Sequence, residues 1–350
     1  MNLFGTTAAE LQRELKDSLG LPRFRAKQIL EWIYQHGADS FEQMTNLPKP
    51  LREELGQRYE ISGAVLRDRL DSSDGQTSKF LLAFSDDTTV ETVLMRQSYG
   101  NSICVSSQAG CNMGCAFCAS TLHGMTRDLT KGEMLAQTLY INGQLKPEGK
   151  KVDTIVVMGS GEPLMNYPEL LGFLRLLHEP YVLNFGYRNI TVSTSGIVPN
   201  IYRLMEEDIP VTLSISLHAP NDALRSELMP INRKFPLKDV VRAGRVYGER
   251  TKRRVTYEYI LIDHVNDGEE HARELCRLLE GQLANVNLIP VNPVRERNLF
   301  RPPKERILFF ESFLKKRHIS VTIRKEMGTD INAACGQLRN RHLQEEGNRR

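Results

Sequence analysis

The sequence has no long apolar run. Its longest predominantly apolar stretches, Val152 to Met158 and Val211 to Leu217, fall far short of the roughly 20 residues that a membrane helix needs. The start of the chain lacks the basic and apolar segments of a secretory signal, so we expect no membrane span and a cytoplasmic location. Apolar residues make up 40% and charged residues 25% of the 350 residues, which are ordinary globular values and exclude a collagenous or largely disordered chain.

The net charge is also small. Lys and Arg number 46 against 43 Asp and Glu, a formal charge of +3, which permits a polyanionic partner without demonstrating one. The basic residues gather in short clusters of the kind that phosphate contacts use, although a solvated face is the more common reason for such a cluster. These clusters are Arg23/Arg25/Lys27, Lys252-Arg253-Arg254, Lys315-Lys316-Arg317 and Arg349-Arg350.

The chain has six cysteines, and in a reducing compartment they do not indicate a disulfide framework. Three of them, Cys111, Cys115 and Cys118, fall within eight residues. Structural zinc sites are normally closed by four protein ligands, and His123 is the one nearby candidate for a fourth. Three thiolates therefore favour an iron–sulfur cluster with one exposed iron, and zinc stays as the alternative.

The periodicity of apolar residues divides the chain into four parts. Residues 1–62 have helical spacing, with Gly20 and Gly37 where helix ends favour a left-handed residue. Residues 63–98 have a period of two and turn signals, which predicts a β-meander with strands near 64–70, 78–84 and 89–96. In residues 99–340 strand-like and helical segments alternate, and residues 341–350 form a basic tail.

The alternating part predicts an α/β fold around a parallel sheet. Helix starts are indicated by a capping box at Thr130 and by Asn166 followed by Pro168. Periodicity alone does not choose between a closed barrel, a partial barrel and an open doubly wound sheet. The expected strands are Ile103–Ser107, Val152–Met158, Ile190–Thr194, Val211–Leu217, Val255–Ile262, Val286–Pro290 and Ile319–Ile323.

Polar residues or glycines directly follow these strands. Because ligands of α/β folds bind at the carboxyl ends of strands, we expect these segments to meet at one pocket. The segments are Gln108 to Cys118, Gly159-Ser160-Gly161-Glu162-Pro163, Ser195-Gly196, His218, Asp263 and Asn292.

Two of these motifs resemble those of the radical S-adenosylmethionine (SAM) superfamily. The spacing Cys-x3-Cys-x2-Cys is that of its cluster loop, and Gly159 to Pro163 is similar to its glycine-rich "GGEP" segment. Further motifs are similar to those of the RlmN/Cfr RNA methyltransferases over residues 10–340. They are Ser106 to Cys111, Ser193-Thr194-Ser195-Gly196, Ser216-Leu217-His218-Ala219-Pro220, Met229-Pro230-Ile231-Asn232 and Asp330 to Leu338.

The resemblance implies a partial or full (β/α) barrel of radical SAM type, with the N-terminal helices as an RNA-binding accessory domain. It implies one 4Fe-4S cluster on Cys111, Cys115 and Cys118, and two molecules of SAM per turnover. The residues that it assigns to SAM binding are Gly161, Glu162, Ser193, Ser216, Leu217, His218 and Asn292.

The resemblance also implies a catalytic thiol at Cys335, which by itself would suggest only a small buried packing residue. The methylated ring carbon of adenine is electron-poor and cannot attack the methyl group of SAM. Cys335 would therefore accept a methyl group from one SAM, and a radical made from a second SAM would activate that S-methyl group for addition to adenine. Cys104 matches the resolving thiol that releases the product through a transient disulfide with Cys335.

Glu91 shares a strand face with Val93 and Met95, an unfavourable place for a carboxylate unless it faces solvent or has a task. The resemblance assigns this position to the proton acceptor, which removes the adenine proton as the product regains aromaticity.

Within the family, the sequence favours the RlmN type, which methylates carbon 2 of adenosine in 23S rRNA and tRNA. Ala109, Pro163 and Ser195 stand where the Cfr type, which methylates carbon 8 of the rRNA adenosine, tends to have Cys, Ala and Ile. The family implies an electron donor such as flavodoxin or ferredoxin, and we expect a monomer. A hypothesis from another class is a zinc-stabilised RNA-binding protein without catalysis.

Overall fold

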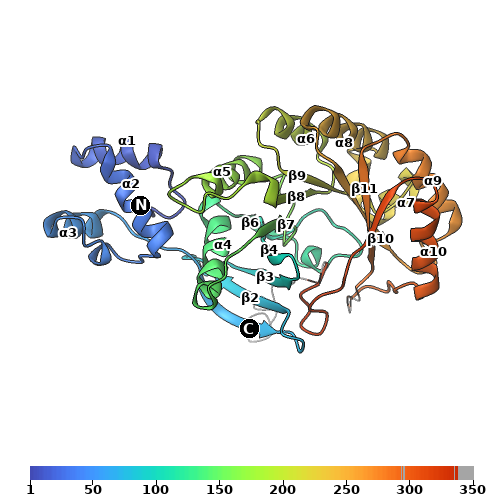
Figure 1. Cartoon of the computed structure of the whole chain (residues 1–350), viewed down its shortest axis with the longest axis horizontal. Coiled ribbons are helices and arrows are strands. Elements are labelled where there is room, and N and C mark those ends of the chain that lie inside the picture. The colour runs from blue at the N-terminus through green and yellow to red at the C-terminus, as the bar shows by residue number, and fades with distance from the viewer. Residues whose placement is uncertain (293, 295, 335, 338–350) are drawn as a thin grey trace.

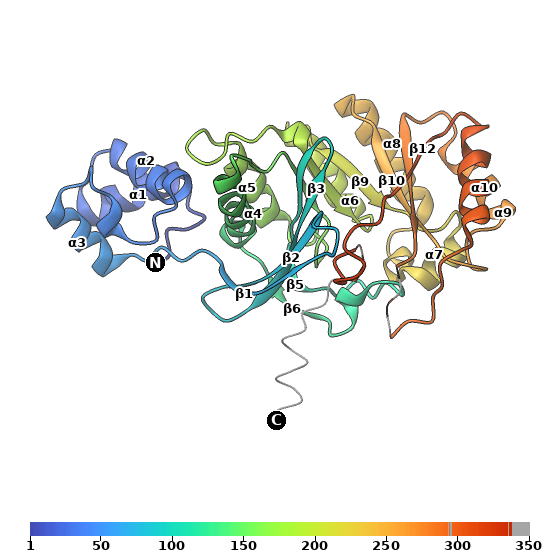
Figure 2. The same ribbon diagram turned by 60° about the horizontal axis from the view of Figure 1, so that its bottom comes forward.

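The computed structural model describes residues 1–292, 294, 296–334 and 336–337 (Figures 1 and 2). Cys335 and the basic tail 341–350 lie outside these described residues. No helix within them is long and apolar enough to cross a membrane. One hydrophobic cluster extends from Leu11 near the N-terminus through the sheet to Phe310.

The first sixty residues form the expected helices, α1 (Ala8–Leu19), α2 (Phe24–Glu31) and α3 (Lys49–Arg58). Thr7 and Glu10 form a capping box at the start of α1. Gly20 and Gly37 adopt the left-handed conformation predicted for them, the first at the end of α1 and the second after a π-turn that extends α2.

The strands form one ten-stranded sheet in the order β1-β2-β3-β4-β7-β8-β9-β10-β11-β12. Pairs from β1 to β4 are antiparallel and pairs from β4 to β12 are parallel. Within the described residues β1 and β12 are the two edges, so the sheet is an open, partial barrel and not a closed one. The bounds are β1 (Val65–Asp71), β2 (Thr77–Ala83), β3 (Thr89–Gln97), β4 (Gly100–Cys104), β7 (Thr154–Val157), β8 (Ile190–Thr194), β9 (Thr212–Ser216), β10 (Val255–Leu261), β11 (Ala284–Pro290) and β12 (Ser320–Ile323).

Helices cover the outer side of the curved sheet (Figure 1). The capping box at Thr130 is present and starts the first of them. Asn166 occupies the N-cap position of the next, as predicted, with Pro168 in the first turn, but its side chain makes no capping bond and donates to the carbonyl oxygens of Ser107 and Leu129. The helices are α4 (Lys131–Leu145), α5 (Tyr167–His178), α6 (Val198–Glu206), α7 (Asp222–Leu228), α8 (Leu237–Thr251), α9 (Glu269–Leu279) and α10 (Lys304–Lys315).

The expected strand Ile103–Ser107 begins and ends earlier, at Gly100–Cys104. Beyond this strand the Ser106 N–H donates to the buried side chain of Gln137 instead of to a neighbouring strand, and the Ser106 hydroxyl donates to the Glu91 carbonyl. The sequence also gave no indication of a small antiparallel pair beside the cysteine loop, β5 (Gln108–Gly110) with β6 (Met125–Asp128).

The N-terminal helices dock on the start of α4 through a close backbone approach. A Cβ atom on Gly5 would lie 2.5 Å from the Cα of Gly132. Lys131 pairs with Glu10 at 2.6 Å, and the Tyr181 hydroxyl accepts the N–H of Ala8 at 3.0 Å. Two glycines and one ion pair thus fix the helical module against the sheet.

Candidate active site

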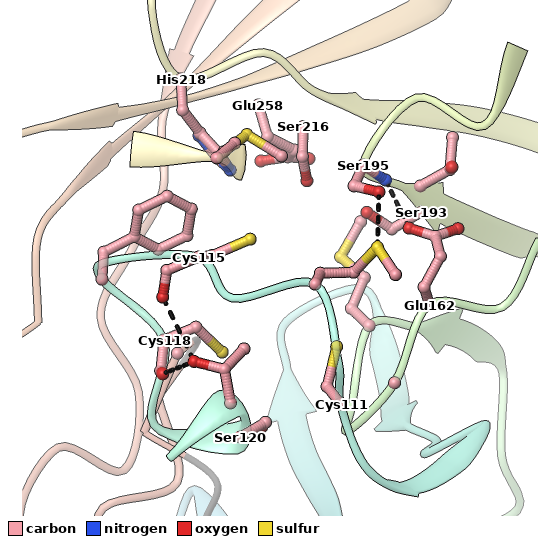
Figure 3. A pocket seen from close by; sticks show the side chains of 18 of the residues that line it. Cys111, Cys115, Cys118, Ser120, Glu162, Ser193, Ser195, Ser216, His218 and Glu258 are labelled. Atoms are coloured by element: carbon pink, nitrogen blue, oxygen red, sulfur yellow. Dashed lines mark hydrogen bonds between the residues drawn. The ribbon is translucent and has the colours of Figure 1, made fainter. Parts of the chain in front are cut away.

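One pocket lies at the carboxyl ends of the parallel strands, as expected from the polar residues that follow them (Figure 3). It contains about 930 Å³ of empty space, counting its open mouth. Strands β7 to β11, the cysteine loop and the segment after β12 all contribute to its wall. Residues that line it include Cys111, Cys115, Cys118, Gly161, Glu162, Ser193, Ser195, Ser216, His218, Glu258, Arg324 and Gly336.

The sulfur atoms of Cys111, Cys115 and Cys118 point toward a common space (Figure 3). Burial raises the pKa of Cys111 to about 11 and raises that of Cys115 as well, so their thiolates require compensating positive charge, which iron ions supply. In the described part of the chain no three His, Cys, Asp or Glu side chains converge closely enough to hold a single metal ion. Three inward-facing thiols around a wider space fit a cluster.

Glu162 is buried, and its carboxylate is already engaged by the backbone. One oxygen accepts the N–H of Ser195 at 2.6 Å and the other accepts the N–H of Leu164 at 3.0 Å. Burial raises the pKa of this carboxyl, although the Ser195 N–H opposes the effect. Glu162 therefore shapes the end of β8 in addition to lining the pocket.

His218 has a left-handed backbone with φ 61° and is buried beside the ring of Phe117. Its Nδ1 accepts the N–H of Ile260 at 3.0 Å. Burial lowers the pKa of His218 to about 3, so the ring is neutral at physiological pH and carries its proton on Nε2. It presents one N–H donor to the pocket and no charge.

Two of the residues expected to bind SAM differ from the others in placement. The side chain of Leu217 lies in the hydrophobic core, while its carbonyl oxygen accepts from Arg225 at 3.1 Å. Asn292 is buried after β11 and is not among the described lining residues. Gly161, Glu162 and the three cysteines, with Ser193, Ser216 and His218, do share the pocket.

Sequence reasoning missed Glu258, which lines the pocket from β10. Its carboxylate accepts from the Ser214 hydroxyl at 2.7 Å and from the Asn287 amide at 2.8 Å. The signal was available, since Glu258 is the one charged residue of an otherwise buried strand. It joins β9, β10 and β11 beneath the site.

Cys104 lies next to this pocket, in a smaller cavity that Ala333 and Ala334 also line. Met158 and Arg324 line both cavities. The carbonyl oxygen of Gly336, which lines the main pocket, accepts the N–H of Ala119 at 2.7 Å. Cys335 itself lies outside the described residues. Of its neighbours in the chain, Ala334 lines the smaller cavity and Gly336 lines the main pocket.

Glu91 is 6% exposed and forms an ion pair with the equally buried Lys79 at 2.9 Å. The Lys79 ammonium also donates to the carbonyl oxygen of Asn332 at 3.2 Å. The possibility that Glu91 faces solvent is therefore excluded. The pair links the β-meander to the C-terminal segment that leads to Cys335.

The chain matches known families and known proteins over most of its length. The family described as "Ribosomal RNA large subunit methyltransferase N-terminal domain" matches residues 1–61, and the Radical SAM superfamily matches residues 105–276. A probable dual-specificity RNA methyltransferase RlmN of Symbiobacterium thermophilum is 53% identical, over 95% of this chain and 90% of its own length. The chain belongs to the RlmN family. Another RlmN, of Bacillus cytotoxicus, is 49% identical over 99% of this chain and 95% of its own.

A solved structure also resembles the chain. The crystal structure of a radical SAM methyltransferase from Sphaerobacter thermophilus has a TM-score of 0.93 and 47% identity, and the match covers 97% of this chain and 99% of that one. The family and the radical SAM α/β fold inferred from the motifs are therefore confirmed. RlmN membership also accounts for the combination of a helical N-terminal module with a three-cysteine pocket.

Proposed function

We propose that the chain methylates carbon 2 of adenosine in 23S rRNA and in tRNA, with an S-methyl group on Cys335 as the intermediate. The observation that carries this proposal is one pocket into which three thiols, Glu162 and His218 all face. Relatives named as dual-specificity RNA methyltransferases match the chain over nearly its whole length, which supports the RNA substrates.

Cys111, Cys115 and Cys118 would hold one 4Fe-4S cluster, and its open iron would bind SAM. When bound, the cluster supplies an electron that cleaves SAM to a radical, and two SAM molecules are used per turnover. The chain's own residues shape the SAM site. The neutral His218 offers an N–H donor, Ser193 and Ser216 offer hydroxyl groups from two strand ends, and Gly161 allows the wall to approach closely.

Cys104 would release the product by forming a transient disulfide with Cys335. Support comes from its burial beside Ala333 and Ala334 in the cavity next to the main pocket. Glu91 would accept the adenine proton. Its carboxylate is held by Lys79 rather than by solvent, which fixes its orientation.

Three residues support carbon 2 over carbon 8. Ala109 is buried in β5, while Pro163 and Ser195 line the pocket, so the positions that distinguish the RlmN type from the Cfr type lie in or near the site. Methylation of carbon 8 of the rRNA adenosine is the alternative that the experiment below separates.

The test is mass spectrometry of nucleosides from rRNA and tRNA in cells that lack their own enzyme, expressing the wild-type chain or Cys335→Ala. We expect 2-methyladenosine from the wild type and none from the variant. Formation of 8-methyladenosine would favour the Cfr type. If a protein that contains its cluster forms neither 2-methyladenosine nor 8-methyladenosine, an adenosine substrate is refuted.

The proposal includes the location of the enzyme, its oligomeric state and its partners. The enzyme would act in the cytoplasm as a monomer, with a flavodoxin or ferredoxin as electron donor and RNA bound partly by the N-terminal helices.

The alternative of another class is a zinc-stabilised, non-catalytic RNA-binding protein, which would be colourless and contain zinc. Protein purified without oxygen should be brown, with iron and sulfide near four each per chain.

A further inference from the structure

Arg225 of α7 is fully buried, with 0% of its surface exposed. Within the described residues its hydrogen bonds all end on neutral oxygens. It donates to the carbonyl oxygens of Ser195 at 2.6 Å and Ser216 at 3.1 Å, and to the side-chain oxygen of Asn232 at 2.8 Å. Burying a guanidinium without a hydrogen-bonded carboxylate is energetically costly, so this position requires a reason beyond packing.

The carbonyl groups that Arg225 holds belong to the ends of β8 and β9. Ser195 and Ser216 both line the pocket. Ser195 is held from two sides, since its N–H donates to Glu162 while its carbonyl oxygen accepts from Arg225. One planar guanidinium, with its donors in a fixed fork, thus sets the positions of two strand ends relative to each other.

The same helix contacts the cysteine loop. The carbonyl oxygen of Leu228, at the end of α7, accepts the N–H of Ala116 at 2.9 Å, and Cys115 belongs to the same hydrophobic cluster as Leu228 and Met229. Helix α7 therefore connects the strand ends to the loop that carries the thiols, with Arg225 at one contact and Leu228 at the other.

Arg225 also brings charge to this place. Burial lowers its pKa to about 10, which leaves it cationic at neutral pH. The strand-end residues that it holds, Ser195 and Ser216, line the same pocket as the three thiols. A three-thiolate cluster carries net negative charge, and its reduction adds more. A nearby buried cation stabilises the reduced form and makes the potential less negative.

We propose that Arg225 is a positioning residue of this site: its guanidinium aligns the ends of β8 and β9 for SAM, and its charge favours reduction of the cluster. The charge role rests on the proposed function, because it requires a cluster on the three cysteines. The alignment role rests on the hydrogen bonds alone.

The test compares Arg225→Lys and Arg225→Met with the wild-type holoenzyme and with a control, Arg242→Met, whose side chain is 64% exposed on α8. Two quantities are measured: the midpoint potential of the cluster by a titration followed by electron paramagnetic resonance, and the dissociation constant of SAM by calorimetry. Arg225→Met should make the potential more negative and weaken SAM binding at least tenfold. Arg225→Lys should keep the potential, because the charge remains, and should still weaken SAM binding. Arg242→Met should change neither.

Arg225→Lys is decisive if the Met variant does not fold, since it retains charge and most of the volume. SAM binding at wild-type strength in the Lys variant would overturn the alignment role. A Lys variant with a clearly more negative potential, or a folded Met variant with an unchanged one, would overturn the charge role. A wild-type chain that binds no cluster would overturn the proposed function and the charge role together. If the wild type is active and both Arg225 variants keep its cluster potential and its SAM affinity, only the proposal for Arg225 is overturned.

Discussion

Gly161 shows how little space the pocket wall leaves at the scale of one residue. Its φ is 106°, and a Cβ atom there would lie 2.6 Å from the Cβ of Gln108. Both the conformation and the contact exclude a side chain. Gly161→Ala should therefore lower the free energy of unfolding by about 1–3 kcal/mol and weaken SAM binding at least tenfold, as measured by denaturant unfolding and calorimetry.

A matched control is Gly143→Ala in α4, where an added Cβ meets nothing within 4 Å. Alanine is the better helix former, so this variant should be as stable as the wild type or more so. SAM binding of wild-type strength in Gly161→Ala would show that the wall adapts and would contradict the prediction.

His218 gives a pH-dependent prediction. Its pKa is about 3 in the folded protein and about 6.5 when unfolded, so the unfolded chain binds the extra proton between these values. The resulting stability is complete above pH 6.5 and is lost as the pH falls toward 3. From pH 8 to pH 5 this group costs about 2 kcal/mol of unfolding free energy.

His218→Asn removes the titrating ring while keeping a side chain that tolerates a positive φ. Denaturant unfolding at pH 8 and pH 5 should show a loss about 2 kcal/mol smaller in the variant than in the wild type. Equal losses in the two proteins would mean that His218 is protonated in the folded state.

Between elements, the β-meander serves as a platform for the C-terminal segment. Lys79 donates to Asn332, the N–H of Ser73 donates to Asp330 at 2.8 Å, and Gly328 packs against Thr77. Lys79→Met removes the ammonium partner of the buried Glu91 carboxylate and should lower the unfolding free energy by about 3 kcal/mol. It should also speed hydrogen exchange at Ala333, whose N–H bonds to the Gly328 carbonyl at 2.8 Å.

The double variant Lys79→Met with Glu91→Leu separates the two effects. An apolar pair of similar volume removes the buried carboxylate together with its ammonium partner, so stability should return toward the wild-type value. Exchange at Ala333 should stay fast, since the bond to Asn332 is still missing. Wild-type exchange rates in both variants would refute the platform.

The sequence predicted elements better than it predicted the contacts between them. The strand Ile190–Thr194 and the cap at Thr130 matched to the residue, because apolar period and capping are local signals. The pair of Lys79 with Glu91 depends on strand register, and the bonds of Arg225 depend on how α7 packs. No local sequence pattern predicts this ion pair or these hydrogen bonds, so both could be identified only in the folded structure.

In the whole molecule, the close approach of Gly5 and Gly132 fixes the N-terminal helices against the sheet. A Cβ on Gly132 would lie 2.7 Å from the Phe4 carbonyl oxygen. Gly132→Ala should therefore loosen the module, and limited trypsin digestion should cleave several-fold faster at Arg58, where α3 ends before the sheet begins. Gly143→Ala, in the same helix, should be cleaved at the wild-type rate. Equal cleavage of all three proteins would show that the docking does not depend on these glycines.

The wall that Gly336 contributes to the main pocket has a consequence for biosynthesis. The thiols of the loop and the ends of β7, β8 and β9 all precede residue 219, so the ribosome adds Gly336 after all of them. Its contact with Ala119 can form only after the cysteine loop and these strand ends have been synthesised. During synthesis this side of the pocket is therefore open. Iron can reach the three thiols from that side until the C-terminal segment docks.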